Sequence, residues 1–276
     1  MTERNIDLRA AINAVSDVIQ NRPRPIREFD QIHMKAGDMV LQSELVANWA
    51  KNKRLAFIGD GDAISVCVAY LKARGIVDYG PSRVTVFDFD ERIVQAIKRF
   101  ADKERIDHLD AELYNCMDGL PENRARFDAF YTNPPWGQYN KGASVNLFLQ
   151  RGMEAIHYDG QGTVVIADDA ELPWTKTVMS EVQNFVLKNG FFINRMMSQL
   201  HSYHLDDAEG LRSCNLMFSS LPDTAREHTL IDIADPALLE GLGTAEDRAL
   251  QGGPRRLSQR DADPECVGSV LGPRAE

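Results

Sequence analysis

The sequence lacks long apolar runs and has few cysteines. Its 276 residues contain no stretch of roughly eighteen apolar residues, so no transmembrane helix is expected. Acidic residues come early in the N-terminal segment, which has no apolar core with a cleavage site, so no secretory signal is expected. The four cysteines lie far apart, at Cys67, Cys116, Cys214 and Cys266. They fit neither a zinc site nor a disulfide framework, and we therefore expect a cytoplasmic protein with no metal.

The chain is also short of basic residues. It has 31 Lys and Arg against 41 Asp and Glu, which gives a formal net charge of −10 at pH 7. A protein that mainly binds phosphate backbones needs a basic surface. Nucleic acid is therefore a disfavoured partner, although a local basic patch is still compatible with this balance. A small-molecule substrate, above all a cationic amine, is favoured, and a homo-oligomer stays possible.

What the sequence does contain is a regular alternation of strand and helix patterns. Short apolar runs predict strands over 54–59, 83–90, 111–116, 127–133 and 162–168. Helical spacing of apolar residues predicts helices over 63–75, 91–106, 144–158 and 175–190. Segments 191–205 and 212–221 then predict an antiparallel hairpin. The result is an α/β fold with a mostly parallel, doubly wound sheet of seven strands, which resembles the Rossmann-like fold of class I S-adenosylmethionine-dependent transferases.

Changes in composition divide the chain into three regions. Residues 1–52 form an N-terminal helical segment and connector, with helices expected over 6–20 and 39–50. Residues 53–221 form the predicted transferase domain. Residues 222–276 are rich in glycine, proline and charge, and we expect an acidic C-terminal extension that is partly flexible.

The first predicted strand ends in the turn Gly59-Asp60-Gly61-Asp62-Ala63. Glycine lets the backbone approach a ligand, and the N-terminus of the following helix offers free N–H groups. A tight turn with no ligand explains this segment alone equally well. Asp60 and Asp62 would repel a carboxylate and attract an ammonium group, so the turn favours decarboxylated S-adenosylmethionine over S-adenosylmethionine itself.

Two acids, Asp88 and Asp90, end the second predicted strand. A carboxylate in this place can accept hydrogen bonds from both ribose hydroxyls of a nucleoside. One of the two acids can instead cap the following helix. We assign Asp88 to the ribose and Asp90 to the cap. After the third strand, Asn115 is a candidate for the adenine amino group, or it simply begins a turn.

The strongest motif is Asn133-Pro134-Pro135-Trp136, at the end of the fourth predicted strand. The prolines fix the backbone and leave carbonyl oxygens free to accept. The Asn133 side chain and the Pro134 carbonyl can therefore hold both hydrogens of an amino group and direct its lone pair at an electrophilic carbon. Trp136 can stack on a planar acceptor. The motif resembles that of amino-methyltransferases that act on adenine, cytosine or glutamine nitrogens.

Further acids and aromatics follow this motif. Asp168 and Asp169 leave the fifth strand, and Asp206 lies in the hairpin link, where acids can bind a polyamine. Asp168 is also a candidate general base. Helix capping and a solvated turn explain these acids equally well. Tyr139 and Tyr203 complete the predicted contacts with the acceptor.

Taken together, these residues resemble the catalytic domain of the branched-chain polyamine synthase family, bis(aminopropyl)spermidine synthase. The resemblance covers about 29–221 and rests on five blocks: Phe29-Asp30-Gln31, Gly59 to Asp62, Phe87 to Glu91, Gly119-Leu120-Pro121 and Phe127 to Trp136. It implies aminopropyl transfer from decarboxylated S-adenosylmethionine to a polyamine nitrogen, with Gln31 closing over the nucleoside.

The resemblance and the motif lead to different acceptors. The family's loop looks like Asp-Pro-Pro-Glu, whereas this chain has Asn133 and Trp136 in place of the acids. Our main hypothesis is an enzyme that transfers an alkyl group, aminopropyl or methyl, to a small cationic amine. The first alternative is an N-methyltransferase for a planar amino group of a base or a glutamine amide. The second is a nucleoside-binding subunit without transfer activity.

Overall fold

The computed structural model describes residues 6–26, 31–120, 126–204 and 210–222. Phe29, Asp30, Pro121, Asp206 and nearly all of the C-terminal extension lie outside these ranges. No helix in the part of the chain that is described is long and apolar enough to cross a membrane.

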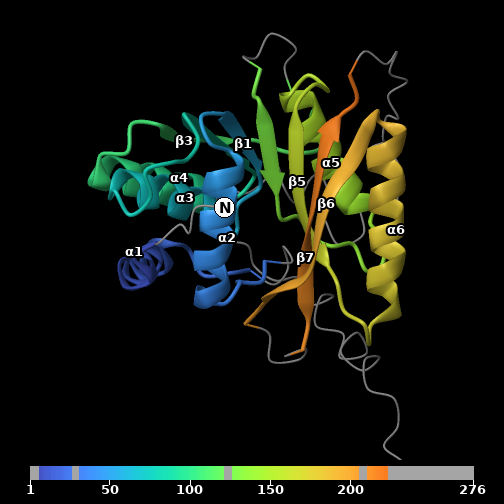
Figure 1. The fold of residues 1–276 in the computed structure, drawn as a ribbon, viewed down its shortest axis with the longest axis horizontal. Coiled ribbons are helices and arrows are strands. Elements are labelled where there is room, and N and C mark those ends of the chain that lie inside the picture. Colours follow the sequence, from blue (N-terminus) through green and yellow to red (C-terminus); the bar gives the residue numbers. More distant parts are fainter. Residues whose placement is uncertain (1–5, 27–30, 121–125, 205–209, 223–276) are drawn as a thin grey trace, which may run out of the picture.

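The described strands form one sheet in the order β3-β2-β1-β4-β5-β7-β6. Their bounds are β1 Arg54–Ile58, β2 Arg83–Asp88, β3 Leu109–Leu113, β4 Ala129–Thr132, β5 Gln161–Ala167, β6 Phe191–Ser202 and β7 Arg212–Ser220. The first five pair in parallel, whereas β7 runs antiparallel to both β5 and β6 (Figure 1). The predicted α/β fold with a terminal hairpin is therefore confirmed.

Helices cover both faces of this sheet. Their bounds are α1 Leu8–Asn21, α2 Ala36–Trp49, α3 Ile64–Ala73, α4 Glu91–Glu104, α5 Ala143–Ala155 and α6 Pro173–Lys188. Buried apolar side chains of α1 to α4 form one cluster with one face of the sheet, and those of α5 and α6 form a second cluster with the other face. The N-terminal helices thus share a core with the sheet.

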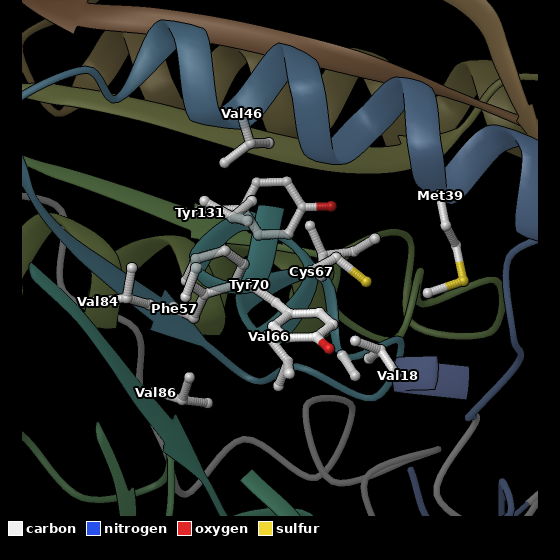
Figure 2. Packing of buried hydrophobic residues seen from close by; sticks show 14 of the residues in the cluster. Val18, Met39, Val46, Phe57, Val66, Cys67, Tyr70, Val84, Val86 and Tyr131 are labelled. Atoms are coloured by element: carbon white, nitrogen blue, oxygen red, sulfur yellow. The ribbon is translucent and has the colours of Figure 1, made fainter. Parts of the chain in front are cut away.

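The first cluster shows how this packing is achieved. Figure 2 shows Phe57, Val84 and Val86 of the sheet below α2, with Tyr131 directly below Val46 of that helix. The rings of Phe57 and Tyr131 lie 4.9 Å apart. Phe57, two positions before Gly59, is fully buried.

The connector between α1 and α2 is held against the end of β6. Met34 forms an antiparallel bridge with Tyr203. The Lys35 N–H donates to the Ser202 carbonyl at 2.9 Å, and the His204 N–H donates to the His33 carbonyl at 2.9 Å. This pairing brings the N-terminal connector to the same edge of the sheet as the ends of β1, β2 and β4.

Candidate active site

A cleft with about 630 Å³ of empty space, part of it open to solvent, lies at the carboxyl ends of β1, β2 and β4. Open α/β sheets generally bind their ligands at this edge. Ten of the predicted site residues line the cleft: Gln31, Gly59, Asp60, Gly61, Asp62, Asp88, Asn133, Pro134, Trp136 and Tyr203. The sequence therefore predicted most of the residues that the fold brings together here.

The β1–α3 turn uses two left-handed residues. Gly59 has φ 74°, and a Cβ built there would lie 3.2 Å from the ring of Phe148. Ala63 has φ 62°. A left-handed alanine costs ~1 kcal/mol. The turn is therefore specified by its surroundings as well as by its own residues.

The Asp60 carboxylate accepts hydrogen bonds from the protein's own backbone. It accepts from the N–H of Ile64 at 2.9 Å and of Ser65 at 3.1 Å, and it also accepts from the Ser65 hydroxyl. These groups are in the first turn of α3, whose N–H groups need acceptors. Burial raises the pKa of Asp60 well above its ordinary value. The expectation that this side chain attracts a ligand ammonium is corrected, because its oxygens face the helix.

Asp62 joins three parts of the cleft. Its Oδ1 accepts from the Met34 N–H at 2.7 Å, and its Oδ2 accepts from the Asn133 amide at 2.9 Å. The Arg22 guanidinium lies 3.7 Å from Oδ1. Burial raises the pKa of Asp62, and the Met34 N–H and Arg22 partly offset this rise. One carboxylate thus ties the connector and the β1–α3 turn to the motif after β4.

Asp88 and Asp90 have different partners. Asp88 accepts from the N–H groups of Asp60 at 2.9 Å and of Asp90 at 2.8 Å, so its carboxylate is fixed at the floor of the cleft. Burial raises its pKa to about 6. Asp90 caps α4 by accepting from the Arg92 N–H, as expected, and pairs with the Arg92 side chain at 2.5 Å. Gln31 donates to the same carboxylate at 3.1 Å.

The Asn133 amide is oriented by Asp62. Because its Nδ2 donates to that carboxylate, its Oδ1 is left as the acceptor for a ligand. The preceding Thr132 donates to the Ile58 carbonyl at 2.7 Å, and Ser144 donates to the Pro135 carbonyl at 3.1 Å. These bonds fix the loop on both sides of the Pro134 carbonyl.

Trp136 and Tyr203 form the far wall of the cleft. Their rings pack edge to face, with centroids 5.1 Å apart and an interplanar angle of 83°. They are only 8% and 2% exposed, respectively. The Tyr203 hydroxyl lies 2.8 Å from the Ser213 hydroxyl, and burial raises its pKa well above its ordinary value.

Two of the predicted acids, Asp168 and Asp169, lie outside the described cleft lining and bind other groups of the protein. Asp168 pairs with Lys176 at 2.5 Å and accepts from the Gln199 N–H at 2.9 Å. Asp169 accepts from the Glu171 N–H at 2.8 Å in the turn before α6. The expectation that they hold the acceptor, and that Asp168 is its general base, stays a prediction.

Two other predicted residues also lie away from the cleft. Asn115 accepts from the Met117 N–H at 3.0 Å, which is the alternative in which it begins a turn. Tyr139 is 74% exposed. Sequence reasoning missed Arg22, which lies in a connector without a motif, and Phe148, which looks like an ordinary apolar position of a helix.

Comparisons with known proteins identify the family to which this chain is similar. The model of the branched-chain polyamine synthase A C-terminal domain family matches residues 10–223. The N(4)-bis(aminopropyl)spermidine synthase of Methanocaldococcus jannaschii is 27% identical over 143 residues, which are 51% of this chain and 38% of that protein. The synthase of the same name from Thermococcus kodakarensis is 26% identical over 147 residues, 52% of this chain and 39% of that protein. The chain thus matches well under half the length of these relatives.

A solved structure also shares the fold. It is the branched-chain polyamine synthase of Thermus thermophilus in complex with N4-aminopropylspermidine and 5′-methylthioadenosine. The TM-score is 0.64 at 23% identity, and the match covers 82% of this chain and 69% of that one.

Proposed function

This chain belongs to the branched-chain polyamine synthase A C-terminal domain family, and we propose that it transfers an aminopropyl group from decarboxylated S-adenosylmethionine to a nitrogen of a small cationic polyamine. The observation that carries the proposal is the hydrogen bond of 2.9 Å between Asp62 and Asn133. It joins the predicted nucleoside turn to the predicted amine-binding motif in one cleft, which Asp88 also lines.

The charge of the cleft supports a cationic ligand. Its described lining residues include the acids Asp62 and Asp88 and no lysine or arginine. Asp60 also lines the cleft, but its oxygens face the first turn of α3. Two arginines outside the described lining pair with acids, Arg22 with Asp62 at 3.7 Å and Arg92 with Asp90 at 2.5 Å. A ligand that carries a sulfonium and an ammonium but no carboxylate is favoured in such a field. The carboxylate of Asp88 has free lone pairs for ribose hydroxyls at the end of β2.

The cleft residues can then promote the reaction by orientation. The nucleoside supplies an electrophilic carbon bonded to a sulfonium sulfur. Asn133 Oδ1 and the Pro134 carbonyl accept N–H hydrogens of the amine and direct its lone pair at that carbon. The N–C bond forms as the C–S bond breaks, and the electron pair of the C–S bond stays on the sulfur as a neutral thioether. The new ammonium releases its proton to water.

A second candidate rests on the identity of two residues. Asn133 and Trp136 are a neutral amide and an aromatic ring at a place where acids would be expected to hold a cation. They favour methylation of a planar amino group, such as that of a nucleobase or a glutamine amide, from S-adenosylmethionine. A nucleoside-binding subunit without transfer activity is the remaining alternative.

One assay separates these three functions. The protein is incubated with either donor and with a linear polyamine, an oligonucleotide or a glutamine-containing peptide, and products are identified by mass spectrometry. We expect an added aminopropyl group on the polyamine and one equivalent of 5′-methylthioadenosine. Methyl transfer to the oligonucleotide or peptide, without polyamine product, would overturn the proposal. Nucleoside binding without any transfer would support the subunit.

A further inference from the structure

A chain of buried polar side chains runs from the cleft to the middle of α2. We call it the buried relay, and it consists of Tyr203, Ser213, His201 and Gln42. The Tyr203 and Ser213 hydroxyl oxygens are 2.8 Å apart, Ser213 Oγ lies 2.9 Å from His201 Nδ1, and His201 Nε2 lies 2.8 Å from Gln42 Oε1. Apart from Tyr203, every member is fully buried. Such a set of polar groups is costly to bury unless each has a partner.

The orientation of the Gln42 amide gives the buried relay a direction. Gln42 Nε2 donates to Tyr131 Oη at 3.2 Å and to Asn215 Oδ1 at 2.9 Å, so both of its hydrogens are used. Its Oε1 also accepts from Asn215 Nδ2 at 2.8 Å. This oxygen can therefore only accept from His201. Figure 2 shows Tyr131, one of these partners, beneath the helix that carries Met39 and Val46.

The orientation of Gln42 determines which group donates at each hydrogen bond of the buried relay, as far as the phenol of Tyr203. His201 must carry its proton on Nε2, because Gln42 offers an acceptor there. Burial lowers the pKa of His201 to about 4, so the ring is neutral near pH 7 and its Nδ1 is an acceptor. The Ser213 hydroxyl then donates to Nδ1 and accepts from the Tyr203 hydroxyl. The phenol proton points away from the cleft, and the phenol oxygen is left as an acceptor.

The charged groups around His201 do not alter this result. Asp38 of α2 acts on the His201 ring and raises its pKa, although by less than burial lowers it. Asp38 itself accepts from the Ser202 N–H at 2.8 Å and from the Ser202 hydroxyl. Asp62 acts on Tyr203, whereas burial and Asp38 are the causes of the shift at His201.

We propose that Gln42, His201 and Ser213 are positioning residues that hold the Tyr203 phenol oxygen as a hydrogen-bond acceptor beside Asn133. The Asn133 side chain is hydrogen-bonded to both Asp62 Oδ2 and the Tyr203 phenol, so these are then two acceptors on the donor side of the Asn133 amide. With both present, that amide keeps its Oδ1 toward the amine substrate. If the buried relay ran the other way, the phenol would donate, and Asp62 alone would hold the Asn133 amide in this orientation.

The direction of the buried relay can be tested without any activity. In protein labelled with ¹⁵N-histidine, long-range proton–nitrogen spectra distinguish the two neutral tautomers, and the His201→Gln variant identifies the His201 signals. We expect the Nε2–H tautomer between pH 5.5 and 8. The Nδ1–H tautomer, or an imidazolium in this range, would overturn the proposal. This result is independent of whether the proposed function is correct.

The kinetic consequence rests on the proposed function. Ser213→Ala removes the acceptor for the phenol proton, and we expect kcat to fall about tenfold while the affinity for 5′-methylthioadenosine changes less than twofold. Ser43→Ala is the matched control, because it removes another fully buried hydroxyl, next to Gln42, outside the buried relay. A Ser213→Ala enzyme with wild-type kcat, or an equal loss in Ser43→Ala, would contradict the proposal.

A double-mutant cycle separates positioning from general destabilisation. Tyr203→Phe removes the phenol, so adding Ser213→Ala to it should lower kcat by less than twofold more. If the kcat of the double variant fell by the product of the two single losses, Ser213 would act by some route other than Tyr203, and the proposal would be overturned. A wild-type protein that transfers nothing would refute the proposed function, whereas the tautomer measurement would still decide the direction of the buried relay.

Discussion

The proposed function divides the cleft into a nucleoside half, with Asp60 and Asp88, and an amine half, with Asn133, Trp136 and Tyr203, and the two halves are built by different kinds of contact. In the nucleoside half, Asp60 and Asp88 accept from backbone N–H groups that lie 2 to 28 residues away in sequence. In the amine half, Asn133 is held by a side chain 71 residues away, and His201 meets Gln42 across 159 residues. The nucleoside half is thus shaped by local backbone, and the amine half by distant side chains.

This difference predicts how each half responds to substitution. Backbone N–H groups are present whatever the neighbouring side chains are, so the nucleoside half depends mainly on its few carboxylates. A side-chain partner is lost completely when one residue changes, so the amine half depends on several residues at once. We therefore expect binding and transfer to be separable by mutation.

The largest expected effect is that of Asn133→Ala. The rate of transfer should fall about a hundredfold to a thousandfold, because the variant loses the oxygen that orients the amine. The affinity for 5′-methylthioadenosine should change little. Calorimetry and a single-turnover assay measure the two quantities, and Asn194→Ala, at an exposed asparagine of β6, is the control. An equal loss of binding and transfer would remove the distinction between the two halves.

Asp88→Asn should have the opposite effect to Asn133→Ala: nucleoside binding should weaken, while transfer stays nearly unchanged. An amide can accept at only one of its two polar atoms, so a charged hydrogen bond of ~2 kcal/mol to the ribose is lost, which is roughly a thirtyfold weaker affinity. At saturating nucleoside, kcat should stay within a few-fold of wild type. Asp110→Asn in the adjacent strand is the control. An unchanged dissociation constant would show that Asp88 does not contact the ligand.

The same carboxylate predicts a dependence on pH. Burial raises the pKa of Asp88 to about 6, against the opposing effect of the Asp60 and Asp90 N–H groups. The ionised form accepts both ribose hydroxyls, so nucleoside affinity should rise with pH through about 6 and be about tenfold weaker at pH 5 than at pH 8. In Asp88→Asn this rise should disappear. If the nucleoside affinity of the variant still rose with pH, the pH dependence would belong to another group, such as Asp62.

The fold could be predicted because its signals are local. Each predicted strand and helix is found, and differences are confined to the ends, as where α6 begins at Pro173, a residue that suits a first helical turn. The assignment of Asp90 as a cap followed from Asp90 and Glu91 alone. The cleft residues of the nucleoside turn were predictable for the same reason, since they follow strands directly.

The corrections concern side-chain direction, which the sequence does not specify. Asp60 and Asp62 are two residues apart, yet one faces the helix and the other faces Asn133. Gln42 and His201 gave no signal, because an isolated glutamine in a helix and a histidine in a strand look like ordinary positions. Their roles depend on a register between α2 and β6 that exists only in the folded chain.

The smallest expected effect is that of Asp168→Asn, and it tests whether the amine half ends at Tyr203. The carboxylate already pairs with Lys176 and accepts from the Gln199 N–H, and it lies outside the described cleft lining, so we expect it not to bind the amine. Transfer should stay within about threefold of wild type. Because Lys176 is half-exposed, the ion pair contributes little, and the free energy of unfolding should fall by only ~1 kcal/mol. A selective rise in KM for the polyamine, at unchanged stability, would instead extend the amine half to β5 and show that the bond to Lys176 opens when the substrate binds.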